Sequence, residues 1–177
     1  KLVNFASLDP AITRTGRTGL GNASSLDREV WEEFHANWEQ LALECALVSE
    51  RLRGNRPEPA SDIASDDSLN PNDYIGETKQ VLTEQRIKQG FFRRAVLASY
   101  RGRCCMSGLS DARLLIASHI VPWSQDKTNR LNPSNGLCLS ALHDKVFDKG
   151  LITLSDDFKV IVSEELKRGK EAFIEAV

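Results

Sequence analysis

Two of the chain's three histidines, His119 and His143, lie within residues 104–150, and Asn135 stands between them. A neutral imidazole titrates near neutral pH, so it can take a proton from water, and a second imidazole can hold a divalent cation. Hydrolysis of a phosphodiester needs both functions. A base must activate water, and a cation must neutralise the charge that develops on the phosphoryl and leaving oxygens. The order His, Asn, His therefore favours metal-assisted hydrolysis of a phosphodiester.

These residues belong to different expected elements. The apolar run 114–118 is rich in large aliphatic residues and predicts a buried strand that ends at His119. Apolar residues recur at three- and four-residue intervals over 139–147, which predicts a short helix that carries His143. The segment 129–135 is rich in Pro and Asn and predicts a loop.

The segments around this stretch are expected to support it. Residues 77–88 are interpreted as extended or mixed structure, and 90–100 as a helix with an apolar face. Residues 104–106, followed by a Ser-Gly turn and the run 114–120, predict a β-hairpin. Residues 151–162 predict a second hairpin that extends the sheet of this domain.

The same blocks resemble the ββα-metal (HNH) nuclease motif, and wider blocks resemble bacterial HNH proteins of the restriction endonuclease type. The resembling blocks are NFASLDPAITRTGRTGLGNASSLDREVWEEF, GFFRRAVLASYRGRCCMSGL, ASHIVPW and NRLNPSNGLCLSALHDKVFDKGLITL. They cover most of the chain outside residues 53–76. The resemblance implies an α+β fold, a ββα-metal nuclease domain preceded by a long-helix arm, and DNA as the substrate.

The resemblance also implies a role for each residue of the motif. His119 falls on the general base, Asn135 on the residue that steadies the loop, and His143 on a metal ligand. The implied cofactor is a divalent cation, with Mg²⁺ the first choice and Mn²⁺, Ni²⁺ or Zn²⁺ as alternatives. A role in restriction or defence is expected.

The chain departs from the family pattern directly before the base. Many HNH nucleases carry an acidic residue or His there as a second metal ligand, and this chain has Ser118. A hydroxyl is a poor ligand for a hard dication compared with a carboxylate. Asp144 and Asp148 are the nearest carboxylates to His143, and we favour Asp148 because a spacing of five leaves it near the His143 face of the helix.

The formal net charge of −2 conceals a division along the chain. Residues 86–150 hold 11 Lys and Arg against 4 Asp and Glu, whereas residues 1–85 hold 8 against 15. A polyanion would prefer the block that contains both motif histidines. The side chains predicted to contact phosphate are Arg93, Arg94, Lys127, Arg130 and Lys145.

The composition predicts three regions. Residues 1–53 form a connector and one long amphipathic helix over 26–52, whose apolar seam could join two copies of the chain. Residues 54–76 are rich in Pro, Ser and Asp and are interpreted as a linker. Residues 77–177 form the nuclease domain, with its motif at 104–150. Because the chain begins at Lys1 rather than Met and ends within a helical pattern, we expect it to be a piece of a longer protein.

Other classes of function were weighed against the nuclease. A catalytically degenerate nucleic-acid-binding module is the main alternative, because Ser118 removes a customary ligand. A zinc site built from Cys104 or Cys105 with Cys138 and a His is a further alternative, as is a Cys/His hydrolase, although no nucleophile turn surrounds any cysteine. The absence of a membrane-length apolar run and of a signal-peptide pattern favours a cytoplasmic protein without a membrane partner.

Overall fold

The computed structural model describes residues 5–54 and 77–168 of the chain. The chain divides into two compact units, residues 1–53 and 54–177. Except for Gly54, the predicted linker 54–76 lies outside the described residues, as does the helical pattern at 170–177. No helix in the described ranges is long and apolar enough to cross a membrane.

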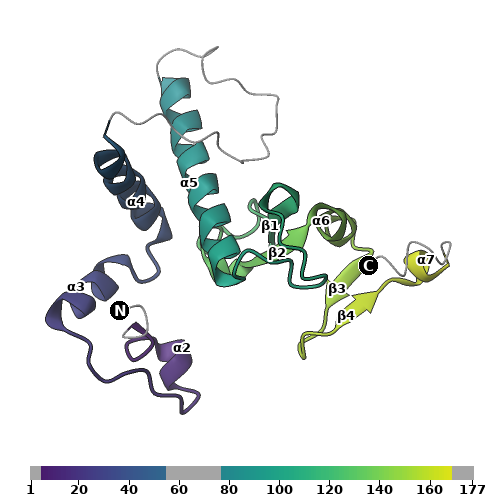
Figure 1. The fold of residues 1–177 in the computed structure, drawn as a ribbon, viewed down its shortest axis with the longest axis horizontal. Helices are drawn as coiled ribbons and strands as arrows, with labels where there is room; N and C mark the ends of the chain where they lie inside the picture. The colour runs from purple at the N-terminus through teal and green to yellow at the C-terminus, as the bar shows by residue number, and fades with distance from the viewer. Residues whose placement is uncertain (1–4, 55–76, 169–177) are drawn as a thin grey trace. The chain divides into compact units, whose positions relative to one another are not determined.

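The N-terminal unit contains the helices α2 (Pro10–Thr13), α3 (Ser25–Phe34) and α4 (Trp38–Arg53), shown in purple to blue in Figure 1. Helix α3 begins at a capping box, in which the Ser24 hydroxyl accepts the Asp27 N–H at 3.1 Å and the Asp27 carboxylate accepts the Ser24 N–H at 2.9 Å. The predicted start of a helix at this position is therefore confirmed.

The prediction of one continuous helix over 26–52 is wrong. Ala36 has a φ of 62°, which lies in the left-handed region and breaks the right-handed helix. Asn37 then starts α4, because its side-chain oxygen accepts the N–H of Gln40 and its carbonyl accepts the N–H of Leu41. The spacing of apolar residues runs through this break and so conceals it. The apolar face over 26–52 that was expected to join two copies of the chain is therefore divided between the two helices α3 and α4.

The second unit carries one long helix and two small sheets. Its described elements are α5 (Glu77–Ser99), η2 (Ala112–Leu114), β1 (Leu115–His119), η3 (Pro133–Asn135), β2 (Gly136–Ser140), α6 (Ala141–Asp148), β3 (Ile152–Leu154), β4 (Val160–Val162) and α7 (Glu164–Lys167). Strands β1 and β2 pair antiparallel, and Figure 1 shows this sheet between α5 and α6. The architecture is α+β, with a ββα unit formed by β1, β2 and α6.

The hairpin predicted within 104–120 is wrong, because β1 pairs with β2 rather than with residues 104–106. All five residues of β2 are buried, so its sequence lacks the alternation that identifies a half-exposed strand. Residues 104–108 instead form a turn, in which the Cys104 N–H donates to the Leu109 carbonyl at 2.8 Å. The second hairpin is confirmed as β3 and β4, but it forms a separate sheet.

Helix α5 is longer than predicted. The interpretation of 77–88 as extended or mixed structure is wrong, since these residues belong to the 23-residue helix. They are mostly Gln, Lys, Glu and Arg, which favour helix without marking an apolar face. The helix ends at Ser99, next to the predicted end at residue 100, because Gly102 has a φ of 62° and its N–H donates to the Leu97 carbonyl at 2.7 Å.

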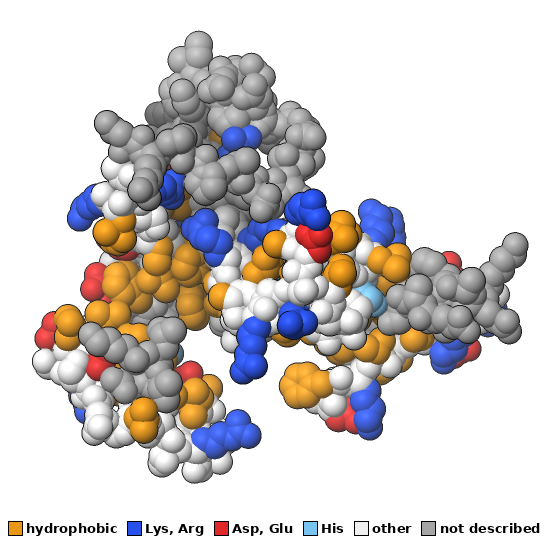
Figure 2. Space-filling model, viewed as in Figure 1, with side chains coloured by type: hydrophobic (Ala, Val, Ile, Leu, Met, Phe, Trp, Pro, Cys, Tyr) orange, Lys and Arg blue, Asp and Glu red, His pale blue; other side chains and the backbone are white. Residues whose placement is uncertain are grey.

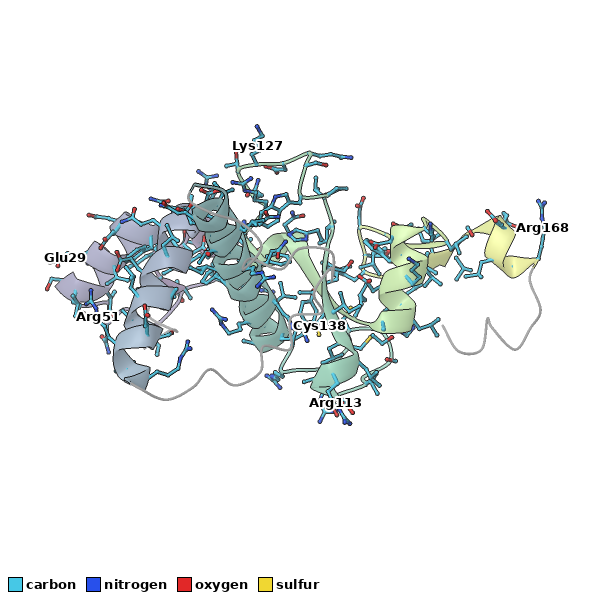
Figure 3. All side chains as sticks on the ribbon, turned by 90° about the horizontal axis from the view of Figure 1, so that it is seen from above. Glu29, Arg51, Arg113, Lys127, Cys138 and Arg168 are labelled. Atoms are coloured by element: carbon cyan, nitrogen blue, oxygen red, sulfur yellow. The ribbon has the colours of Figure 1, made fainter. Side chains whose placement is uncertain are left out.

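The hydrophobic core of this region lies between the β1–β2 sheet and the helices α5 and α6. The buried residues of this region include Phe92 and Val96 of α5, Leu115 of β1, Leu137, Cys138 and Leu139 of β2, and Val146 of α6. Figure 3 shows Cys138 on its strand in the interior of this unit. Arg93 adds a polar link, because its guanidinium donates to the carbonyls of Leu115 at 2.6 Å and Ala112 at 3.0 Å. Helix α5 is thus fixed to the start of β1.

Candidate active site

His119 is the last residue of β1, and its ring is half-buried. Its Nε2 lies 2.8 Å from the backbone carbonyl of Arg130. A carbonyl can only accept a hydrogen bond, so Nε2 carries the proton and Nδ1 of the neutral ring carries the lone pair. The loop between β1 and β2 therefore selects one tautomer of His119, and the atom left to accept a proton is Nδ1.

Two aromatic rings contact the His119 ring. The Phe92 ring lies parallel to it, with centroids 3.9 Å apart and an interplanar angle of 7°. The Trp123 ring meets it at 89°, with centroids 5.6 Å apart. The guanidinium of Arg130 in turn lies over the Trp123 ring, 5.0 Å from its centroid, which is within the range of a cation–π contact.

Asn135 lies directly before β2 and holds the residues that follow His119. Its Oδ1 accepts the N–H of Val121 at 2.8 Å, and its Nδ2 donates to the carbonyl of Val121 at 3.1 Å. Its own carbonyl accepts the N–H of Ile120 at 2.9 Å. These three bonds fix the backbone immediately after His119.

His143 is placed differently from the other motif residues. Its side chain lies in the core, with 2% of the residue exposed, and its Nδ1 lies 2.6 Å from the Ser140 hydroxyl and 3.7 Å from the sulfur of Cys104. Ser140 is also the N-cap of α6, since its hydroxyl accepts the His143 N–H. These contacts fix the first turn of α6 against the segment 104–108.

Ser118 of β1 and Asp144 of α6 lie near each other. The Ser118 residue is 4% exposed, and its hydroxyl has no hydrogen-bond partner of normal geometry among the described residues. It nevertheless lies close enough to the Asp144 carboxyl to lower that group's pKa. The net pKa of Asp144 is raised, chiefly by burial and also by the charge of Asp148. Asp144 and Asp148 are four residues apart and share one face of α6. The Asp148 carboxylate is therefore near Asp144, four residues before it, and its relation to Asp144 is a better guide to its position than the spacing of five from His143.

These oxygens fit a hard divalent cation better than the His143 ring does. A buried hydroxyl without a partner and a desolvated carboxylate beside it are the kind of ligands that Mg²⁺ or Mn²⁺ takes in proteins. No group of three or more His, Cys, Asp and Glu side chains converges within the described parts of the chain. The described side chains thus show no complete cation site.

The predicted phosphate-binding residues differ in their surroundings. Arg93 already donates to two backbone carbonyls, and Arg130 is half-buried against Trp123. Arg94, Lys127 and Lys145 are exposed, and Figure 3 shows Lys127 at the outer edge of the β1–β2 loop. Figure 2 shows basic side chains spread over several parts of the visible surface rather than gathered in one patch.

The cysteines form no zinc cluster with histidine in the residues that the structure describes. All four are free thiols, of which Cys104 and Cys138 are buried. Hydrogen bonds, chiefly from Ser107 in the neighbouring turn, outweigh burial and lower the pKa of Cys104. The Cys104 sulfur serves the turn by accepting the Ser107 N–H at 3.5 Å.

Two residues of the site were missed by sequence reasoning. Ser140 stands three residues before His143, the spacing of an N-cap, and this local signal could have been found. Phe92 reaches His119 from a helix 27 residues earlier in the chain, and no local pattern predicts that contact.

Comparison with known proteins gives a match to a family model over part of the chain. Residues 104–155 match the family model HNH_2, described as HNH endonuclease. The matched segment contains β1, β2 and α6 together with the loop that holds Asn135. No curated protein matches the chain. The match supports an HNH-type nuclease domain with a ββα-metal fold in this segment.

Proposed function

We propose that the chain is a divalent-metal-dependent endonuclease that hydrolyses phosphodiester bonds in DNA. The observation that carries this proposal is the placement of His119 at the end of β1. Its Nε2–H donates to the Arg130 carbonyl, and its Nδ1 is left to accept a proton. The family match over 104–155 supports the nuclease class. The resemblance to bacterial restriction-type proteins supports a role in restriction or defence.

His119 acts as the general base of the reaction. Nδ1 takes a proton from the attacking water, and the Arg130 carbonyl, which holds Nε2–H, stabilises the imidazolium that forms. Asn135 keeps the backbone after His119 in place through its bonds to Val121, so that the ring does not swing away during the proton transfer. A positioned base of this kind contributes about 10²- to 10⁴-fold in rate.

Asp144 is the residue best placed to hold the cation, with the Ser118 hydroxyl beside it and Asp148 one turn further along α6. A bound Mg²⁺ or Mn²⁺ supplies charge stabilisation for the phosphoryl and leaving oxygens. His143, which we predicted as a ligand, acts instead through the helix, because its bonds to Ser140 orient the turn from which Asp144 projects. Ni²⁺ and Zn²⁺ suit these oxygen ligands less well.

DNA is the proposed substrate, and Lys127, Arg94 and Lys145 are the exposed cations proposed to contact its backbone. Arg130 directly precedes the buried residue Leu131, and its backbone carbonyl holds Nε2–H of His119. Its positive charge therefore lies close to the proposed base.

Self-association through residues 26–52 stays a proposal, although two helices, α3 and α4, now take the place of the single predicted helix. Light scattering on the purified chain measures it.

The degenerate binding module remains the second candidate, and Ser118 is the observation that favours it. The residue directly before the base provides a hydroxyl where a carboxylate would bind a cation more strongly. This candidate predicts DNA binding that weakens with salt and no cleavage with any divalent ion.

Incubation of supercoiled plasmid with the chain in Mg²⁺, Mn²⁺ or EDTA separates the two candidates. The endonuclease converts the plasmid to open-circular and linear forms with the cations and not with EDTA. A protein that shifts the plasmid on a gel but leaves it supercoiled in both cations is the binding module.

A further inference from the structure

The ring that faces His119 comes from outside the segment that matches the nuclease family. Phe92 lies in α5, twelve residues before the match begins at Cys104, and is 2% exposed. Its parallel contact with His119, with centroids 3.9 Å apart and an interplanar angle of 7°, places the Phe92 ring over one face of the imidazole. The Trp123 ring, at 89°, restrains the imidazole from a second direction.

Gly136 makes this contact sterically feasible. It is the antiparallel partner of His119 in the β1–β2 register, so the two residues share a face of the sheet. A Cβ on Gly136 would lie 2.9 Å from Cζ of Phe92 and 2.4 Å from Cγ2 of Val96. Both distances are below normal contact. The missing side chain at Gly136 therefore provides the space through which the Phe92 ring reaches His119.

We propose that Phe92 is a positioning residue for the nuclease reaction, acting through His119 by fixing the plane of its ring. The proposal rests on the proposed function of His119 as the base. The χ2 torsion of histidine is broad and roughly two-fold, so an unrestrained ring exchanges the positions of its nitrogens and carbons. A flat neighbour parallel to the ring holds the ring in one plane. Within that plane the Arg130 carbonyl selects the orientation with Nε2 facing it, which leaves the Nδ1 lone pair in one direction.

A role in core packing alone is the competing explanation, and the chain provides a matched control. Phe91 is the adjacent residue of α5 and is also buried, with 9% exposed, but it forms no stacked or T-shaped pair in the described part of the chain. Phe91→Leu and Phe92→Leu remove the same atoms from neighbouring core positions. Only the second removes the flat surface beside His119.

The first experiment compares these two variants with the wild type in plasmid cleavage and thermal unfolding. We expect both variants to lower Tm, and only Phe92→Leu to lower kcat, by roughly 10- to 100-fold with KM changed less than about threefold. Gly136→Ala, whose Cβ would lie 2.9 Å from Cζ of Phe92 and so displace that ring, should reproduce the loss in kcat. Equal kcat losses in Phe91→Leu and Phe92→Leu, or a wild-type kcat in Phe92→Leu, would overturn the proposal.

The second experiment needs no catalysis and uses ¹⁵N-correlated NMR spectra of the His119 ring in the full chain. The wild type should show the Nε2–H tautomer and ring protons shifted upfield by the Phe92 ring. Phe92→Leu should lose the upfield shift and show a mixture of tautomers, whereas Phe91→Leu should resemble the wild type. An unchanged tautomer in Phe92→Leu overturns the positioning role. If the wild type is inactive while these NMR changes occur, the proposed nuclease function fails and the positioning of His119 by Phe92 stands.

Discussion

Asn135 and Val121 exchange two hydrogen bonds, although 14 residues separate them in the chain. The Val121 N–H donates to Oδ1 at 2.8 Å, and Nδ2 donates to the Val121 carbonyl at 3.1 Å. The amide of Asn135 thus closes the loop that begins after His119, and 8% of the residue is exposed.

Asn135→Asp keeps the shape of the side chain but removes one donor. A carboxylate oxygen then faces the Val121 carbonyl, and an unsatisfied buried polar pair costs about 1–3 kcal/mol. We expect the free energy of unfolding in urea to fall by that amount and cleavage to slow. An exposed loop substitution, Ser134→Ala, serves as the control. Wild-type stability and rate in Asn135→Asp would show that the Val121 bonds do not hold the base.

Ser118→Ala removes the buried hydroxyl beside Asp144, which forms no hydrogen bond of normal geometry within the described residues. An unsatisfied buried polar group costs about 1–3 kcal/mol, so stability measured in EDTA should stay equal or rise. Titration calorimetry with Mn²⁺ should show weaker binding, because a ligand oxygen is lost. The opposite change, Ser118→Asp, should strengthen Mn²⁺ binding and lower stability in EDTA. Unchanged Mn²⁺ affinity in both variants would place the cation away from Ser118.

Asp144→Asn tests the proposed ligand through stability as well as binding. The pKa of Asp144 is raised, chiefly by burial, so the ionised carboxylate is less favourable in the folded protein than in the unfolded chain. Its penalty is absent at acid pH, where the carboxyl is protonated, and sets in as pH rises through the folded pKa. We therefore expect Asp144→Asn to raise Tm in EDTA at neutral pH and to abolish the rise in Tm that Mn²⁺ produces in the wild type.

Two variants make the Asp144 result specific. Asp148→Asn should weaken the Mn²⁺ effect less than Asp144→Asn does, because Asp148 is exposed. Asp156→Asn, in the turn of the β3–β4 hairpin, should leave it unchanged. A full Mn²⁺ response in Asp144→Asn would remove this residue from the cation site.

Lys127→Gln should weaken DNA binding without affecting the fold. Lys127 is exposed at the outer edge of the β1–β2 loop, and the loss of one phosphate contact reduces the slope of log K against log salt by about 1. Arg113→Gln is a control for the loss of charge, since Figure 3 shows Arg113 on the opposite side of the unit and it is paired with Asp111. Fluorescence anisotropy over a salt series measures both. Equal slopes for Lys127→Gln and the wild type would contradict the contact.

Sequence patterns located the site where a local signal was strong. The aliphatic run before His119 marked β1, and the apolar spacing that begins at residue 26 marked the start of α3. The family resemblance selected the segment that the HNH model later matched. Each of these signals lies within a few residues of the feature that it identifies.

The features that were missed depend on contacts distant in sequence. Strand β2 has no alternation because both of its faces are buried, between α5 and α6. The break at Ala36 depends on one backbone torsion that apolar spacing does not report. His143 stands at the position of the last histidine of the HNH motif, but its burial beside Ser140 and Cys104 depends on tertiary packing, which the motif does not report.

The most direct measurement of the central claim is single-turnover cleavage of plasmid DNA by His119→Ala, with and without added imidazole. If Nδ1 of His119 is the base, cleavage should fall by about 10²- to 10⁴-fold, and imidazole in solution should restore part of the rate while Mn²⁺ affinity stays at the wild-type value. Cleavage by His119→Ala at the wild-type rate, with the same dependence on the cation, would contradict the assignment of His119 as the base.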